Sequence, residues 1–498
     1  MTKTSRAPRR PLILAAISIA AVLLGLWLLE RPRQGLEITP LSVGTTPATV
    51  MRLPGAEGPV VIIAHGFAGS RQLMAAWQLT LARAGYITVA FDFEGHGRNP
   101  VPMSGDVDSI EGTTRLLVDE TRRVTDAALA LPGADGRAAL LGHSMASDII
   151  VRAGLEDDRV EALIAISAFS EAITAEAPEN LLILNGAWEG MLRQAAVRAM
   201  APFGVAEGET AGTPGDGFAR RAVAVPLAEH VTVLYAAPGL EEAGAWLNAT
   251  FDRPGPVPVA RIGAPILLML FGVVLLALPL ARLLPRGPRP WSPDRGRFLA
   301  LAILPALVTP LALSFVETRY LPVLVADYLA LHLALYGVLV LAGAAYLGGF
   351  PKGRGWIWGL VLALYGVLAF GGLLDRYVAS FVPHPGRVPV VLAIVPGAIL
   401  AMLADAVLLE GARAPLWRRS LARVAFLVSL AIAVALDFER LFFLILILPV
   451  IALFYATFGM MGRAVGRRTG SVVAMGLGLG LVLGWALGVS FPMFDPTL

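Results

Sequence analysis

The 498-residue chain contains no cysteine. This absence excludes thiol nucleophiles, cysteine-ligated metal sites and disulfide bonds, and it leaves the redox compartment open. The chain also has no glycine-rich phosphate loop, zinc signature or dinucleotide fingerprint. The sequence therefore predicts neither a cofactor nor a metal site.

Charge is scarce as well. Asp, Glu, Lys and Arg make up only 15% of the residues, whereas an ordinary globular domain carries about 25%. Lysine occurs only as Lys3 and Lys352, and the arginines form short clusters beside apolar runs. No nucleic-acid partner is expected, because such a partner would require basic residues along one continuous face.

Hydrophobic residues account for 56% of the chain, and many of them lie in long runs. The first run, residues 11–29, is just long enough to cross a hydrocarbon core of about 30 Å. Basic residues precede it, and its end at Leu29 runs directly into the charged stretch 30–33 with no convincing small-x-small cleavage site. An uncleaved signal anchor is therefore predicted, with a cleaved signal peptide as the alternative.

Eight further apolar segments begin at Ile262 and are separated by short loops. One such segment could be a buried helix of a soluble core, but eight in succession predict a bundle of membrane helices. Together with the first run they make nine predicted spans. The eight segments cover about residues 262–285, 298–316, 321–347, 356–374, 388–409, 420–436, 441–461 and 470–491.

Basic clusters fall at the N-terminus and then on every second connection between these segments. The positive-inside rule then places the N-terminus in the cytoplasm, and the C-terminus and the region between the first two spans outside it. We expect a multi-pass protein of a bacterial-type inner (plasma) membrane, with the lipid bilayer as its partner. The later clusters lie at 282–297, 352–354, 413–423 and 463–468. The predicted domains are a tail and anchor helix (1–34), an extracytoplasmic domain (35–255) and a transmembrane domain (256–498).

Residues 35–255 have a different pattern, in which short apolar runs alternate with stretches of helical length. This alternation predicts a mostly parallel sheet with helices on both faces. The opening segment, 36–53, alternates apolar and polar residues more strictly and is expected to supply antiparallel edge strands. The predicted buried strands are 60–64, 87–92, 138–141, 162–166 and 181–184.

The sequence Gly-His-Ser-Met-Ala at 142–146 matches the Gly-x-Ser-x-Gly/Ala pattern of a nucleophile elbow. An elbow turns sharply from strand into helix, so small residues are needed on both sides of the serine. The pattern alone is weak in a glycine-rich chain. Here a predicted strand ends at it and a helical pattern, 145–155, follows it. Ser144 is therefore the predicted nucleophile.

A hydrolytic serine needs an imidazole to accept its proton. His230 follows the apolar stretch 222–227 late in the predicted soluble domain, which suits the chain order serine, acid, histidine. His230 is the predicted base, and a solvent-exposed loop histidine is the alternative. The other histidines lie after early strands, in the elbow or in the membrane region: His65, His96, His143, His332 and His384.

The orienting acid should follow a late strand, and Glu189 comes shortly after the strand predicted at 181–184. Glu171, after the preceding strand, is the alternative acid. The structural explanation for Glu189 is an ordinary carboxylate at a helix N-terminus. An oxyanion hole needs two backbone N–H donors, which we expect from Met145 and from Phe67 in the loop after the first buried strand.

Four runs occur in order along the chain: VVIIAHGFAGS, AFDFEGHGRN, LLGHSMAS and EHVTVLY. Together they resemble the α/β-hydrolase superfamily over about residues 36–252. The resemblance implies Ser144 as nucleophile, His230 as base, and Phe67 and Met145 as oxyanion donors. The chain departs from the superfamily pattern at Glu189, where aspartate is more usual, and at Ala146, where glycine is more usual.

In this superfamily a cap often follows the sixth strand, but only 167–180 separates the corresponding predicted strands. We therefore expect little or no cap. Our hypothesis is that the membrane or the extracytoplasmic loops of the bundle cover the site. Two charged groups, Asp375/Arg376 and Asp437/Glu439/Arg440, lie on the side required for docking. The alternative is that they are ordinary interfacial charges.

The predicted function is hydrolysis of a carboxylic ester of an apolar or lipid-derived substrate, through an acyl-enzyme on Ser144. Acyl transfer is an alternative that the sequence does not separate from hydrolysis, because both reactions use the same three side chains. An alternative from another class is a transporter-like or receptor-like membrane protein that carries a sensory hydrolase-fold domain.

Overall fold

The computed structural model describes residues 9–107, 109–318, 320–349 and 355–495. Several basic residues used in the predicted charge alternation lie outside this part of the chain. They are Lys3, Arg6, Lys352 and Arg354.

The chain folds into two units. The sheet unit comprises the described residues of 25–267 together with two short segments, 375–380 and 492–495. The helical unit comprises the described residues of 9–24, 268–374 and 381–491. The predicted boundaries at residues 34 and 255 lie near the ends of the long stretch of the sheet unit. The two short segments are not part of the predicted soluble domain.

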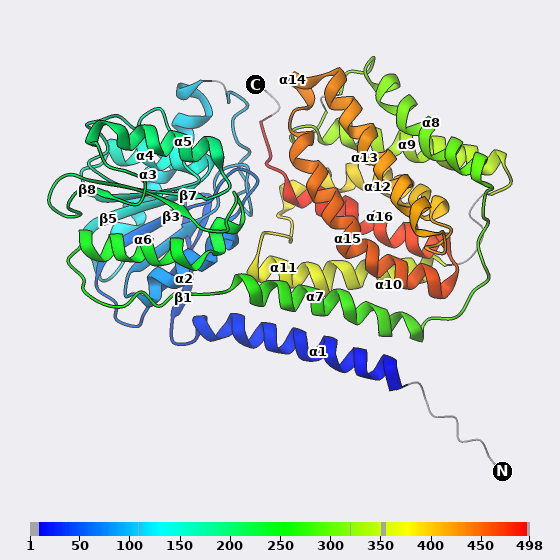
Figure 1. Cartoon of the computed structure of the whole chain (residues 1–498), viewed down its shortest axis with the longest axis horizontal. Helices are drawn as coiled ribbons and strands as arrows, with labels where there is room; N and C mark the ends of the chain where they lie inside the picture. Colours follow the sequence, from blue (N-terminus) through cyan, green and yellow to red (C-terminus); the bar gives the residue numbers. More distant parts are fainter. Residues whose placement is uncertain (1–8, 108, 319, 350–354, 496–498) are drawn as a thin grey trace, which may run out of the picture. The chain divides into compact units, whose positions relative to one another are not determined.

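The sheet unit contains one nine-stranded sheet, with strand order β1-β2-β4-β3-β5-β6-β7-β9-β8 among the described residues (Figure 1). The central strands pair in parallel, from β4 through β3, β5, β6 and β7 to β9. The pairs β1–β2, β2–β4 and β8–β9 are antiparallel. This confirms the predicted mostly parallel sheet. The strands are β1 (Glu37–Val43), β2 (Thr46–Arg52), β3 (Gly58–Ala64), β4 (Ile87–Phe91), β5 (Ala134–His143), β6 (Val160–Ile166), β7 (Asn180–Gly186), β8 (Thr210–Gly212) and β9 (Ala219–Val225).

Helices cover both faces of the sheet (Figure 1). α3 and α4 pack together on one face, and α2 and α6 pack together on the other. The core between the layers contains large side chains with no exposed surface, including Trp77, Phe91 and Phe93. Burial of each such side chain contributes roughly 1.5–3 kcal/mol. The helices are α2 (Ala75–Arg83), α3 (Arg115–Leu129), α4 (Met145–Leu155), α5 (Gly190–Met200) and α6 (Ala237–Thr250).

Nine helices among the described residues are long and apolar enough to cross a membrane. They agree with the nine predicted spans. The fifth span runs through a π-helical stretch, Tyr365–Gly371, between α10 and α11. The helices are α1 (Arg9–Glu30), α7 (Gly263–Leu280), α8 (Arg295–Leu313), α9 (Ala326–Tyr346), α10 (Trp356–Leu364), α11 (Gly372–Tyr377), α12 (Val388–Leu408), α13 (Leu416–Leu436), α15 (Leu444–Thr469) and α16 (Val472–Ser490), with a short α14 (Phe438–Leu441) between α13 and α15.

The contact between α12 and α16 is built on glycine. Four glycines at every fourth position of α16 face the backbone of α12. A Cβ added at Gly480 would lie 2.5 Å from Ile399 Cα, and one at Gly484 would lie 2.7 Å from Val395 Cα. The two helices can approach this closely only because these positions lack side chains. The four glycines are Gly476, Gly480, Gly484 and Gly488.

Candidate active site

Ser144 occupies a strained turn between β5 and α4. Its backbone has φ +55° and ψ −119°. Residues other than glycine rarely adopt positive φ, and strain of this kind concentrates at functional sites. A Cβ added at Gly142 would lie 2.5 Å from the carbonyl oxygen of Ala146. The glycine at position 142 is therefore required by the close approach of the chain to itself.

The structure brings Ser144, His230 and Glu189 together. Ser144 follows β5, Glu189 follows β7 and His230 follows β9, so all three lie in loops at the carboxyl ends of parallel strands. The Ser144 hydroxyl lies 2.8 Å from His230 Nε2. On the other side of the ring, His230 Nδ1 lies 2.6 Å from Glu189 Oε1.

The protonation of this chain of contacts follows from Glu189, whose side chain is only 6% exposed. Burial alone would raise the pKa of this carboxyl, but hydrogen bonds outweigh burial and hold the pKa below its usual value. The donors are His230, the N–H of Gly186 at 2.6 Å and the hydroxyl of Ser167 at 2.9 Å. An ionised carboxylate can only accept, so His230 Nδ1 carries the proton and Nε2 accepts the proton of the Ser144 hydroxyl.

The contacts agree neither with Glu171 as the acid nor with Glu189 as an ordinary carboxylate at a helix N-terminus. Glu171 is exposed in the loop after β6 and forms no hydrogen bond with His230 among the described residues. Glu189 directly precedes α5, but its carboxylate accepts no capping hydrogen bond from that helix. Its bonds go instead to His230, Gly186 and Ser167.

The loop after β3 lies against the elbow. A Cβ added at Gly66 would lie 3.0 Å from Ser144 Cβ and 2.9 Å from His143 Nδ1. Phe67, one of the two predicted oxyanion donors, is the next residue. The other, Met145, opens α4, where first-turn N–H groups have no acceptor within the helix. Phe67 therefore follows a glycine that lies close to Ser144, and Met145 follows Ser144 directly.

Two histidines support the site in ways that the sequence does not reveal. Buried His143 donates from Nε2 to the backbone oxygen of His230 at 2.8 Å. Burial, and next the neighbouring His230, lower the pKa of His143 to about 4, so its ring is neutral at pH 7. His65 is also buried and donates from Nδ1 to the Gly66 oxygen at 2.8 Å while Nε2 accepts from the N–H of Phe93 at 3.2 Å. His143 therefore holds the His230 loop, and His65 holds the Gly66 loop.

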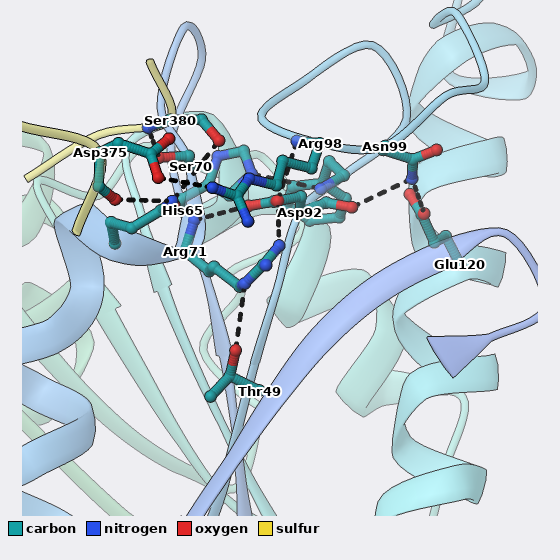
Figure 2. Close-up of polar contacts among 12 residues, drawn as sticks. Thr49, His65, Ser70, Arg71, Asp92, Arg98, Asn99, Glu120, Asp375 and Ser380 are labelled. Carbon is teal, nitrogen blue, oxygen red and sulfur yellow. Dashed lines mark hydrogen bonds and ion pairs between the residues drawn. The ribbon is translucent and has the colours of Figure 1, made fainter. Parts of the chain in front are cut away.

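Behind these loops lies a buried carboxylate, Asp92, at the end of β4 (Figure 2). It accepts a hydrogen bond from the Arg71 N–H at 2.8 Å and pairs with the Arg71 guanidinium. It also accepts from the N–H of Arg98 at 3.0 Å. Asp92 thus joins the loop after β3 to the loop after β4.

The segment 375–380 binds to the same two loops (Figure 2). Arg98 Nη2 lies 2.5 Å from Asp375 Oδ2, and the N–H of Ser380 donates to the Ser70 hydroxyl at 3.1 Å. Of the two charged groups proposed for docking, the one at Asp375 belongs to the sheet unit itself, and Asp375 pairs with one of its loops. In the other, Asp437 pairs locally with Arg440 at 2.7 Å.

The segment 492–495 lies along the loop after β4. Met493 donates to the Gly95 oxygen and accepts from the Met103 N–H, both at 2.8 Å. Phe494 forms a parallel bridge with Met103, and its ring centroid lies 6.4 Å from that of Phe67. This segment therefore packs on the loop that carries one predicted oxyanion donor.

Exposed apolar side chains follow the carboxyl ends of β6, β7 and β9. Trp188, directly after β7, is 67% exposed, and Leu227, after β9, is 81% exposed. The five residues are Phe169, Trp188, Met191, Leu227 and Val231, and we call them the apolar rim.

Residues 56–201 match a family model described as "Serine aminopeptidase, S33". No curated protein matches the chain. The family match, the sheet order and the elbow identify an α/β-hydrolase domain joined to a bundle of apolar helices, and they support a hydrolase.

Several solved structures are similar to part of the chain. A hypothetical protein from Pseudomonas aeruginosa is 14% identical and covers 43% of this chain and 94% of its own, with a TM-score of 0.33. A bacterial membrane phospholipase A is 15% identical and covers 48% and 91%, with a TM-score of 0.30. An epoxide hydrolase from Vigna radiata is 24% identical and covers 27% and 41%, with a TM-score of 0.21.

Proposed function

We propose that this chain, an α/β-hydrolase domain joined to membrane-length helices, is a membrane-bound serine hydrolase that cleaves carboxylic esters of apolar or lipid-derived substrates. The observation that carries the proposal is the continuous chain of contacts from Ser144 through His230 to Glu189, at 2.8 and 2.6 Å. These distances are those at which a base can take the proton of a serine hydroxyl.

In the first half of the reaction, the Ser144 oxygen attacks the ester carbonyl while its proton passes to His230 Nε2. Ionised Glu189 stabilises the imidazolium that forms and keeps the ring in its productive tautomer. The N–H groups of Phe67 and Met145 donate hydrogen bonds that stabilise the negative charge developing on the carbonyl oxygen. Each such donor contributes about 10²- to 10³-fold in rate. Collapse of the tetrahedral intermediate releases the alcohol, which takes the proton from His230.

In the second half, water attacks the acyl-enzyme. His230 takes a proton from the water, and the resulting oxygen nucleophile forms a second tetrahedral intermediate at the same carbonyl carbon. Breakage of the Ser144 ester bond then releases the carboxylic acid, and His230 returns its proton to the serine oxygen. The catalytic residues end in their starting protonation states.

The proposal of an apolar substrate is supported by the surroundings of the site. The connection between β6 and β7 spans only residues 167–179, too short for a cap of several helices. The apolar rim is exposed at the loops that carry Glu189 and His230. An acyl chain or the bilayer surface would cover these side chains, in place of the cap of other α/β-hydrolases.

A fluorophosphonate probe tests the nucleophile and its sidedness together. We expect the full chain to be labelled, and Ser144→Ala and His230→Ala to lose labelling. Ser42→Ala, which alters an exposed serine on β1, should keep it. A membrane-impermeant probe should label intact cells from which any outer membrane has been removed, if the domain lies outside the cytoplasm. Unchanged labelling of Ser144→Ala would overturn the proposal.

The family match favours one further candidate, hydrolysis of an aminoacyl amide bond. The same three residues would carry it, with an amine as the leaving group. Rates on matched p-nitrophenyl esters and aminoacyl p-nitroanilides separate the two activities, and we expect the ester of a medium-chain acid to be the better substrate. Products formed with added acceptor alcohols separate hydrolysis from acyl transfer.

A further inference from the structure

Three arginines near the ends of two membrane-length helices line one cavity, Arg419 and Arg423 on α13 and Arg463 on α15. Their positive charges therefore lie near one another. One carboxylate partly balances them, since Asp405 of α12 lies 3.4 Å from Arg423. In the part of the chain that the structure describes, Arg419 and Arg463 form no ion pair.

Neighbouring arginines are satisfied within the protein. Arg418 pairs with Glu410 at 2.9 Å, and Arg468 donates to the backbone oxygen of Leu284 at 2.7 Å. Arg413 donates to the backbone oxygen of Gly287 at 3.2 Å. Arg419 and Arg463 therefore differ from these three arginines, because their side chains form no ion pair or hydrogen bond with the described residues.

Arg419 and Arg463 line a cavity of about 240 Å³ between α13 and α15. Arg423 also lines it and is held in place, with its guanidinium 4.4 Å from the centre of the Tyr455 ring. Close approach is possible because position 459 is glycine, where an added Cβ would lie 3.2 Å from Arg423 Nη2. Three guanidinium groups and one tyrosine thus surround a space otherwise bounded mainly by apolar side chains.

Three positive charges around a partly desolvated cavity, with one carboxylate beside them, are unfavourable unless an anion enters. The planar guanidinium fork matches the oxygens of a phosphate group and binds them in pairs. Basic pockets between membrane helices bind phospholipid headgroups by this chemistry. We propose that this cavity is a phosphate-binding site, occupied either by the headgroup of an anionic phospholipid or by free phosphate.

The depth of the cavity favours the lipid. Arg419 is in the first turn of α13, and Arg463 is six residues before the end of α15. At 1.5 Å per residue, these positions lie about 5–9 Å from the helix ends. These positions lie near the edge of the hydrocarbon core, from which a long arginine side chain can reach the headgroup region.

The test uses the full chain purified in a neutral detergent, with binding and thermal unfolding as readouts. The probes are mixed micelles containing phosphatidylglycerol, micelles containing phosphatidylcholine, and inorganic phosphate. We expect saturable binding and a higher Tm with phosphatidylglycerol but not with phosphatidylcholine. Arg463→Gln should weaken binding by about ten-fold or more, because one charge-assisted hydrogen-bonding group is lost.

Arg297→Gln is the matched control. It removes the same charge at the start of α8, where the side chain is 55% exposed and does not line the cavity. Arg419→Gln is the second cavity variant, used if Arg463→Gln fails to fold. An equal response to inorganic phosphate, with no further gain from the lipid, would assign the site to free phosphate. Binding that is absent, or equal in the cavity variants and the control, would overturn the proposal, and none of these outcomes depends on hydrolase activity.

Discussion

The two units of this chain bury their interiors in different ways. The sheet unit packs bulky side chains such as Trp77, Phe91 and Phe93 between its layers. In the helical unit, the contact of α12 with α16 instead places glycines at every fourth position against the neighbouring backbone. In the sheet unit large apolar groups fill the interior, whereas at this contact the absence of side chains makes the packing possible.

The difference follows from the solvent that each unit faces. Removing large apolar groups from water is the main force that stabilises a soluble core. Between membrane helices that force is absent, because lipid tails are as apolar as the side chains, and close backbone packing replaces it. In the sheet unit, buried polar groups form hydrogen-bond networks that position the loops around Ser144. Substitutions in these networks should therefore lower catalytic activity before they prevent folding.

The largest effect should come from Glu189→Gln. A neutral amide can donate to His230 Nδ1 and so favours the wrong tautomer, in which Nε2 cannot accept the serine proton. We expect kcat/KM on a p-nitrophenyl ester to fall on the order of 10³- to 10⁴-fold, with the Tm nearly unchanged. Glu171→Gln, at the exposed alternative position, is the control and should leave kcat/KM within about two-fold.

A pH effect on stability should come from Glu120, which has no exposed surface and accepts hydrogen bonds from Asn99 at 2.9 Å and from the Glu94 N–H at 3.0 Å. Burial raises its pKa from 4.5 to about 7. The folded protein therefore holds this proton more tightly than the unfolded chain. The stabilisation is complete below about pH 4.5 and is lost as the pH rises to about 7.

Glu120→Gln should remove this pH dependence. We expect the wild-type sheet unit to lose on the order of 2–3 kcal/mol of stability across that window, and the variant to lose much less. Thermal unfolding of the purified chain at a series of pH values measures both. Parallel pH profiles for the two proteins would contradict this role for Glu120.

Two glycine substitutions with opposite signs test the packing of the helical unit. Gly480→Ala places a methyl group against the α12 backbone and should destabilise the unit by about 1–3 kcal/mol. Gly372→Ala, on α11, meets no atom within 4 Å and should stabilise it by about 0.5–1 kcal/mol, because alanine favours helix. Unfolding of the purified chain in mixed micelles measures the difference. Equal effects would show that close backbone contact is not what stabilises the unit.

The smallest effect should come from the ion pair between Arg98 and Asp375. Arg98 is partly exposed, and pairs of this kind contribute about 0.2–1 kcal/mol. Asp375→Asn should therefore lower kcat/KM by no more than about five-fold, through the loops beside the site. Asp437→Asn breaks a similar pair, with Arg440 in the helical unit, and should leave kcat/KM unchanged.

Much of the fold could be predicted because burial leaves a direct pattern in the sequence. Strands buried on both faces and membrane-length helices appear in the sequence as continuous apolar runs, so the five buried strands and the nine spans could be predicted. Ser144, Glu189 and His230 could be placed in one site by chain order alone, since the carboxyl ends of β5, β7 and β9 meet at one edge of the sheet.

Other features leave no such pattern. β8 has only three residues and pairs only with β9, so its signal is too short to recognise. The bond from His143 to the backbone of His230 depends on the conformations of two loops. The contacts of Asp375 and Phe494 join residues hundreds of positions apart, with no local periodicity to indicate them. The glycines at every fourth position of α16 are visible in the sequence. They were not needed to predict a membrane span, so the close contact with α12 was not predicted.

The sheet unit is built from three stretches of the chain, and this restricts the number of times that the chain can cross the membrane between them. The described residues of 25–267, the segment 375–380 and the segment 492–495 belong to one unit, and Arg98 and Met103 contact the two segments, so all three stretches must lie on one side of the bilayer. An even number of crossings must separate each stretch from the next. Among the described residues, four spans lie between the first and second stretches: α7, α8, α9 and the span formed by α10 and α11. Four more, α12, α13, α15 and α16, lie between the second and third. If the chain skipped or gained one crossing during insertion, Asp375 or Phe494 would lie on the opposite side of the bilayer from Arg98 and Phe67, and these contacts could not form.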